Sequence, residues 1–223
     1  MKFWAQVMAI VRKDVTSEAR TRETISSVLV FTLLVVVIFN FAFGADATAL
    51  GLVAPGILWV TFAFAGVLSL NRSFLVERED GCIEGLLASP ASREAIYVGK
   101  MLGSLIFMLV VEAIALPVFA LLFNLPVLSL EIIATTLLAT VGFTAAGTIF
   151  SAMAVNTRAR ELVLPLLFLP VASPVIISAV EASGLALSGE SWSSMANWLG
   201  IIAAFDAILL VASFLLFPYV IEE

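Results

Sequence analysis

Histidine is absent from this sequence, and cysteine occurs once, at Cys82. A single thiol cannot form an internal disulfide, and a zinc site cannot be assembled without a cluster of cysteine or histidine side chains. The lack of histidine also removes the most common ligand of haem iron and of transition metals. We therefore expect that the chain itself binds no cofactor and no metal, and that any cofactor chemistry belongs to a partner.

Charged residues are scarce as well. They make up 13% of the 223 residues, whereas about a quarter is usual in soluble proteins. Hydrophobic residues make up 62%, and the mean hydropathy is +1.14. A chain of this length cannot hide so much apolar surface in a water-soluble core, so the composition indicates a protein of the lipid bilayer. No cluster of bases is dense enough to predict nucleic-acid binding.

Six stretches are apolar and long enough to cross a bilayer as helices, for which about 17–25 residues are needed. They cover residues 25–43, 52–70, 101–123, 130–154, 162–180 and 199–220. No segment indicates a separate soluble domain. The sequence thus predicts an all-α membrane protein with a single transmembrane domain over residues 1–223.

All lysines and arginines fall on one side of this six-span arrangement. They are Lys2, Arg12, Lys13, Arg20, Arg22, Arg72, Arg78, Arg93, Lys100, Arg158 and Arg160. The loops on the other side, 44–51, 124–129 and 181–198, contain acids but no base. Because basic residues concentrate in cytoplasmic loops, this pattern places both termini in the cytoplasm.

The first 24 residues, read as a helix, have one apolar face. That face comprises Trp4, Met8, Val11 and Val15, and the residues that lie away from it are Lys2, Gln6, Lys13 and Arg20. This pattern is typical of a helix that lies in the membrane interface. The alternative is an ordinary charged cytoplasmic tail.

The loop 71–99, between the second and third spans, is the substantial cytoplasmic loop inside the bundle. Its acids are Glu77, Glu79, Asp80 and Glu84, and they are followed by the apolar or turn-forming residues Leu86, Leu87, Ser89 and Pro90. Ser92 is placed to cap the helix that leads into the third span. An acidic and partly apolar loop at a membrane surface suits the docking of a soluble partner, and the alternative is a solvated connector.

Several strings in and around this loop are recognisable. Within it are the acids followed by Gly85-Leu86-Leu87, then Ser89-Pro90, then Gly99-Lys100. Outside it are Arg12-Lys13-Asp14 with Ser17-Glu18 and Arg20, Gly56-Ile57-Leu58-Trp59 with Phe62-Ala63, and Leu70-Asn71-Arg72-Ser73-Phe74 running into Glu77. The first set resembles the ABC-2 family of transporter permeases, which have a type V exporter-like fold. The combined strings are similar to the CcmB family, the B subunits of the cytochrome c maturation transporter, and the likeness extends over essentially the whole chain.

This resemblance implies a half-transporter of the bacterial inner membrane that pairs with a cytoplasmic ATPase subunit, CcmA. It implies association with CcmC and the small CcmD, in a complex that serves CcmE, the periplasmic haem chaperone. ATP hydrolysis would support haem delivery or the release of the haem-loaded chaperone. The chain lacks a Gly-rich phosphate loop that ends in Lys-Ser/Thr. We therefore expect no enzymatic activity here, with ATP on the partner and haem on other subunits or the chaperone.

The resemblance also implies a cytoplasmic coupling helix between the second and third spans. The residues expected to contact the ATPase are Glu77, Glu79, Asp80, Glu84, Leu86, Leu87 and Pro90. A dimeric ATPase would require two copies of this chain, a homodimer, or one copy and a different membrane subunit.

Two other functions compete with this one. A secondary transporter would have polar clusters at mid-membrane and Gly/Pro breaks in matching halves, whereas only the fifth span shows such breaks. A non-transporting membrane scaffold for haem-handling partners would lack coupling through the loop 71–99.

Two acids fall inside apolar stretches, Glu112 in the third span and Asp206 in the sixth. Ionisable groups in lipid are costly and therefore candidates for function. Glu112 is either a polar point used in a conformational change or partner contact, or a carboxyl packed between helices. For Asp206 we expect the packed role. Neither acid has a basic partner within the spans, so we expect no proton relay.

Small residues and prolines mark the last spans. In the fourth, the pairs Gly142/Ala146 and Gly147/Ser151 would let a helix approach closely, either from this chain or from a second copy. In the fifth, Pro165, Pro170 and Pro174 predict a helix that is bent or broken into a re-entrant element. A periplasmic connector is expected at 184–198.

Overall fold

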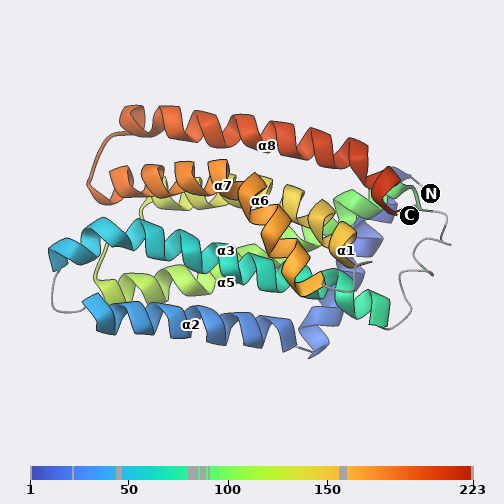
Figure 1. Ribbon diagram of the computed structural model, residues 1–223, viewed down its shortest axis with the longest axis horizontal. Coiled ribbons are helices and arrows are strands. Elements are labelled where there is room, and N and C mark those ends of the chain that lie inside the picture. The colour runs from blue at the N-terminus through green and yellow to red at the C-terminus, as the bar shows by residue number, and fades with distance from the viewer. Residues whose placement is uncertain are drawn as a thin grey trace.

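In the computed structural model the chain forms a bundle of helices. The structure describes residues 2–21, 23–43, 47–79, 85, 89, 91–155 and 160–221, and these contain no strand. The helices are α1 (Phe3–Thr21), α2 (Glu23–Phe43), α3 (Ala47–Glu79), α5 (Arg93–Phe123), α6 (Leu130–Val155), α7 (Arg160–Leu187) and α8 (Trp192–Ile221). Figure 1 shows α2 to α8 aligned along the long axis, with α1 lying across one end.

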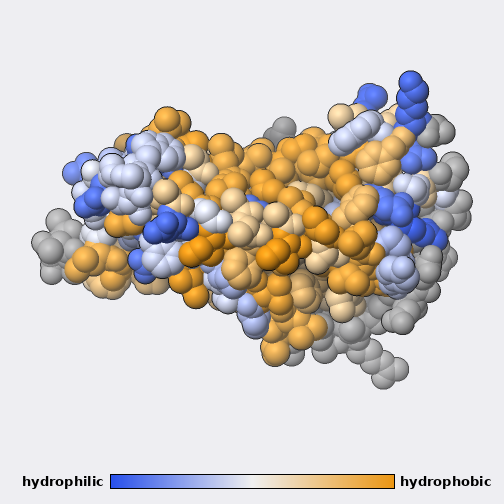
Figure 2. All heavy atoms as spheres, turned by 90° about the horizontal axis from the view of Figure 1, so that it is seen from above, coloured by the Kyte–Doolittle hydropathy of each residue, from blue (hydrophilic) through white to orange (hydrophobic). Residues whose placement is uncertain are grey.

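Six of these helices are long and apolar enough to cross a membrane. Their apolar segments are Ile25–Phe43, Leu50–Asn71, Arg93–Phe123, Leu130–Ala154, Leu164–Leu187 and Trp192–Ile221. Figure 2 shows hydrophobic side chains over the middle of one face of the bundle, with most hydrophilic side chains towards its two ends. Helices suit such apolar surroundings because they satisfy their backbone hydrogen bonds internally. The predicted all-α class and the six spans are confirmed, and the chain is a multi-pass membrane protein.

The connector between α3 and α5 is shorter than the predicted loop 71–99. α3 continues to Glu79, and α5 begins at Arg93. The second span therefore extends as a helix beyond its apolar stretch, because glutamate and arginine are good helix formers. Ser92 caps α5 as predicted, since its Oγ accepts a hydrogen bond from the Ala95 backbone N–H at 3.2 Å.

The predicted connector at 184–198 is also too long, because α7 reaches Leu187 and α8 begins at Trp192. α7 ends in a turn where Gly189 adopts a φ of 75°. The Gly189 N–H donates to the Ala186 carbonyl at 3.1 Å, and the Glu190 N–H donates to the Leu185 carbonyl at 3.0 Å. This is a glycine C-cap, which stops the helix where a left-handed residue is needed.

α7 is one bent helix, not a re-entrant element. Pro165, Pro170 and Pro174 all lie inside it, and Figure 1 shows it bending in the half that carries them. Pro174 has no N–H for the carbonyl of Pro170, and the Ser173 hydroxyl donates to that carbonyl instead, at 2.8 Å. Local replacement of the lost bond lets the helix continue.

α6 lies at the centre of the bundle and contacts α3, α5, α7 and α8. Its buried threonines recur every fourth residue, at Thr136, Thr140, Thr144 and Thr148. The hydroxyls of Thr144 and Thr148 each donate to the carbonyl four residues earlier, at 2.7 Å. These bonds let polar side chains fill an apolar interior.

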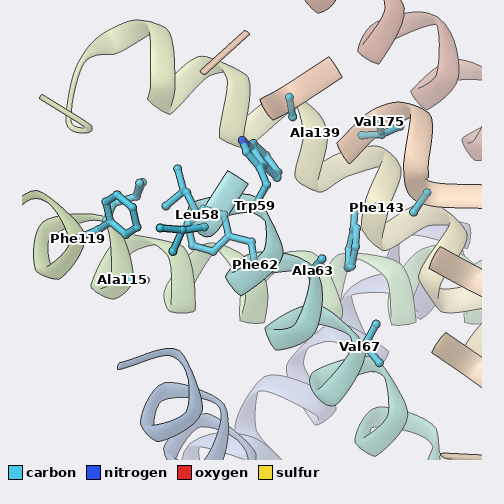
Figure 3. Close-up of a cluster of buried hydrophobic side chains, with 14 of the residues drawn as sticks. Leu58, Trp59, Phe62, Ala63, Val67, Ala115, Phe119, Ala139, Phe143 and Val175 are labelled. Atoms are coloured by element: carbon cyan, nitrogen blue, oxygen red, sulfur yellow. The ribbon is translucent and has the colours of Figure 1, made fainter. Parts of the chain in front are cut away.

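An apolar cluster surrounds this helix. Figure 3 shows Leu58, Trp59 and Phe62 of α3 lying between Phe119 of α5 and Phe143 of α6. The string Gly56-Ile57-Leu58-Trp59 that contributes to the family resemblance is therefore largely core, since Ile57, Leu58 and Trp59 are buried.

Candidate functional site

The residues predicted to contact an ATPase belong to the segment where α3 gives way to α5. Glu77 and Glu79 lie in the last turn of α3. The others, Asp80, Glu84, Leu86, Leu87 and Pro90, lie outside the described residues. Figure 1 shows the flanking ends of α3 and α5 at the end of the bundle that also carries α1 and both termini. This end of the bundle therefore brings α1 together with the end of α3 and the start of α5.

The predicted N-terminal helix is present as α1, but its apolar residues serve two surfaces. Val7 and Val11 are buried against Ala95 of α5. Trp4 and Met8 are 69% and 62% exposed. The predicted apolar face is thus only partly used in packing, and its outer part is available to a membrane interface.

An ion pair between a buried lysine and a partly exposed aspartate joins α1 to α5. Lys100 Nζ lies 3.2 Å from Asp14 Oδ2, and the two side chains are 1% and 18% exposed. Asp14 Oδ1 also lies 3.2 Å from Lys13 Nζ, at the surface. The pair joins Arg12-Lys13-Asp14 to Gly99-Lys100, two strings whose contact was not predicted from the sequence.

Two glycines of α5, one turn apart, allow α1 to approach closely. A Cβ at Gly99 would lie 2.8 Å from the Cβ of Ile10, and a Cβ at Gly103 would lie 3.3 Å from Asp14 Oδ2. Small residues four apart are a known device for close helix packing in membranes. The spacing Gly99-xxx-Gly103 around Lys100 was the available signal for this contact.

Glu112 is buried in the middle of α5 and is 3% exposed. The Thr140 hydroxyl of α6 donates to Glu112 Oε1 at 2.7 Å. Oε2 has no hydrogen-bond partner among the described residues. The residue borders a small cavity with about 10 Å³ of room for a water-sized sphere, on the order of one water molecule. The other walls are Trp59, Phe62, Ala63, Met108, Thr140, Phe143 and Ile176.

Thr140→Val keeps the shape of the side chain but removes the donor to Glu112. We expect it to lower the free energy of unfolding by about 1–3 kcal/mol, because a buried carboxyl oxygen loses its partner. Heating the detergent-solubilised protein and measuring the folded fraction by gel filtration checks this. Thr148→Val is the matched control, because the Thr148 hydroxyl bonds to a backbone carbonyl of its own helix. Equal stability of the two variants would contradict the prediction.

Asp206 of α8 is buried and lies against Gly142 of α6. A Cβ at Gly142 would overlap the Asp206 carboxyl and lie 3.3 Å from the Asp206 Cα. Glu112 and Asp206 therefore reach α6 from α5 and α8, at positions two residues apart. Asp206 is packed between helices, and a part for either acid in a conformational change stays a prediction.

The second small pair of α6 also packs within the chain. A Cβ at Gly147 would overlap the side chain of Leu70 on α3, and the Ser151 hydroxyl donates to the Leu70 carbonyl at 2.6 Å. The alternative that a second copy packs on this face of α6 is wrong, because α3 and α8 of the same chain cover it.

Metal binding would require several ligating side chains to gather. Within the part of the chain that the structure describes, no group of three His, Cys, Asp or Glu side chains does so. The described interior thus offers hydroxyls, the separate carboxyls of Glu112 and Asp206 and the ammonium group of Lys100, among apolar groups.

Comparison with known proteins supplies the family. Residues 5–222 match the family model described as CcmB protein. Three relatives named heme exporter protein B are similar over most of their length. The relative from Rhodobacter capsulatus is 33% identical over 213 residues, covering 92% of this chain and 95% of the relative. Those from Bradyrhizobium diazoefficiens and Pseudomonas aeruginosa are 33% and 30% identical, covering 81% and 79% of this chain and 82% and 79% of the relatives. The chain belongs to the CcmB family.

Proposed function

We propose that this chain is the membrane subunit of a haem exporter complex and that a separate ATPase subunit drives it. The observation that carries the proposal is the match of residues 5–222, nearly the whole chain, to the CcmB family. The relatives are named heme exporter protein B, and this name supports haem as the molecule that the complex handles. The bundle of six apolar helices supports a role within the membrane.

The energy of ATP would enter through the connector between α3 and α5. α3 extends as a helix beyond its apolar stretch to Glu79, and Ser92 caps the start of α5. Because both flanking segments are helical, a displacement of the connector would be passed directly to two membrane helices. The connector would contact the ATPase through Glu77, Glu79, Asp80, Glu84, Leu86, Leu87 and Pro90.

The distribution of bases supports an orientation for the complex. Lys2, Arg12 and Lys13 are exposed on or beside α1, and a concentration of bases favours the cytoplasmic side. The end of the bundle that carries α1 would thus face the cytoplasm of a bacterial inner membrane and the ATPase CcmA. CcmC, CcmD and a second copy of the chain would pack on the lipid-facing sides, with CcmE at the opposite end. The ATP-driven step would be haem delivery or release of the haem-loaded chaperone.

Charge reversal at the connector tests this proposal. The variant Glu77→Lys/Glu79→Lys/Asp80→Lys replaces three negative charges with three positive ones. We expect it to lose co-purification with CcmA from detergent, because like charges across an interface repel and prevent docking. Gel filtration of the variant alone checks that it is folded.

A matched control carries the same kind of change at the other end of the bundle. Glu181→Lys/Glu190→Lys reverses two exposed acids there and should retain CcmA as the wild type does. Retention of CcmA by the folded connector variant would place the docking surface elsewhere. Absence of any complex with the wild-type chain would overturn the proposed function itself.

A further inference from the structure

Two strings far apart in the sequence meet at one contact. Asp14 of Arg12-Lys13-Asp14 lies against Lys100 of Gly99-Lys100, with the carboxylate and the ammonium group 3.2 Å apart. Removing charges from water is costly, and a pair tolerates it only in good geometry. A lysine that is 1% exposed therefore indicates that the placement of α1 on α5 is specific.

The contact extends along the first three turns of α5. At the start of the helix, the Ser92 backbone N–H points to Gln6 Oε1 at 3.5 Å. Val7 and Val11 pack on Ala95. Further along, the glycines that flank Lys100 remove the side chains that would hold α1 away.

This stretch of α5 is also the first structure after the connector. Ser92 ends the connector and caps α5, so a force on the connector acts first on the residues that α1 covers. A helix that slid over α5 would have to separate the Asp14 carboxylate from the buried ammonium group of Lys100. It would also have to lift Ile10 out of the space above Gly99. Both changes oppose sliding.

We propose that Asp14 and Lys100 are positioning residues that make α1 and the first turns of α5 one rigid unit, which moves together when the connector is displaced. This inference rests on the proposed function, because it takes ATP-driven displacement of the connector as the input. The unit carries the exposed Trp4 and Met8 with it, so motion at the connector reaches the outer surface of α1.

A covalent lock between the two helices tests the proposal. In a Cys82→Ser background, Ile10→Cys/Gly99→Cys places two Cβ atoms close together. A Cβ at Gly99 would lie 2.8 Å from the Cβ of residue 10. A disulfide needs a Cβ–Cβ distance of about 3.5–4.5 Å, so the helices have to separate slightly for the bond to form. The purified complex with the ATPase is oxidised with copper phenanthroline, and its ATP hydrolysis is compared before and after reduction. If α1 and α5 move together, the locked complex hydrolyses ATP as fast as the reduced one.

The charge pair is tested in the same assay. Lys100→Met keeps the length of the side chain, and we expect about a tenfold loss of hydrolysis by the complex, because the variant breaks an ion pair whose lysine is buried. Adding the disulfide should restore the rate, because the disulfide then holds α1 on α5 in place of the ion pair. Lys13→Met is the matched control: Lys13 also pairs with Asp14, but its side chain is 46% exposed, so the rate should stay within about twofold. Asp14→Asn is the second variant if Lys100→Met does not fold.

The outcomes separate this inference from the proposed function. A lock that forms and stops hydrolysis until it is reduced would show that α1 must move over α5, and would overturn the inference. Failure of the disulfide to rescue Lys100→Met would also overturn it. A wild-type chain that never assembles with an ATPase would refute the proposed function and, with it, the input that the rigid unit requires.

Discussion

Gly142→Val is expected to prevent α8 from packing on α6 and to leave little folded protein. At this position a Cβ would overlap the carboxyl of Asp206 and would also lie 3.3 Å from the Asp206 Cα. Rotation of the acid side chain is therefore not enough, and the backbone of α8 has to shift. Overpacking costs about 1–3 kcal/mol or more, a large part of the stability of a typical protein. The fraction of monodisperse protein in gel filtration, and its melting temperature, measure the loss.

The control for this substitution is Gly200→Val, which adds the same side chain where nothing lies within 4 Å. A second comparison isolates the carboxyl. Asp206→Ala removes the oxygen that a new Cβ would strike. Gly142→Ala/Asp206→Ala should therefore be more stable than Gly142→Ala alone, by about 1–2 kcal/mol. Equal stability of Gly142→Val and Gly200→Val would contradict the close approach of α6 and α8.

The spans were predictable because they depend on short continuous stretches of sequence. Residues 25–43 contain no charged residue, and 130–154 contain one, Glu131, at their start. Within a bilayer such stretches can satisfy their backbone hydrogen bonds only as helices or in a closed barrel. Their ends were less predictable. α3 runs on to Glu79 because helix propensity continues where apolarity stops. α7 runs on until Gly189 ends it.

The contacts between helices were not predictable from the sequence, because they depend on which faces meet. Glu112 and Asp206 were recognised as buried acids, but their neighbours Thr140 and Gly142 lie on another helix. Threonine recurs every four residues along α6, and this spacing predicts that the threonines share one face of the helix. The spacing does not predict which other helix packs against that face. Lys100 looked like a residue at the edge of a span, and only the fold brings Asp14 to it.

α1 shows why an amphipathic pattern alone gives an incomplete answer in a membrane protein. The sequence placed Trp4, Met8 and Val11 on one face, and that face has to satisfy two apolar surroundings, protein and lipid. In the fold, Val11 and Val7 pack against α5, whereas Trp4 and Met8 are exposed on the surface of the bundle. Hydropathy does not distinguish these two environments, because lipid tails are as apolar as a protein core.

Trp59→Ala is expected to produce the other large loss of stability. Trp59 is 4% exposed, and its Nε1–H donates to Ser183 Oγ of α7 at 2.9 Å. Its ring meets Phe62 edge-on at 5.8 Å between centroids, and Figure 3 shows it inside the apolar cluster. Truncation of a buried tryptophan costs about 3–5 kcal/mol. We expect about 3 kcal/mol here, because lipid also accepts an exposed indole and the cost is mainly lost packing.

Two further variants separate packing from hydrogen bonding at Trp59. Trp59→Phe keeps an aromatic ring but removes the donor to Ser183, and should lose about 1 kcal/mol. Trp192→Ala removes the same side chain where it is 43% exposed, and should change the melting temperature little. The indole also borders the cavity beside Glu112. Its removal therefore enlarges the space next to Glu112 Oε2, which has no hydrogen-bond partner in the described part of the chain. A Trp59→Ala variant as stable as Trp192→Ala would contradict the packing of α3 and α7 against the Trp59 indole.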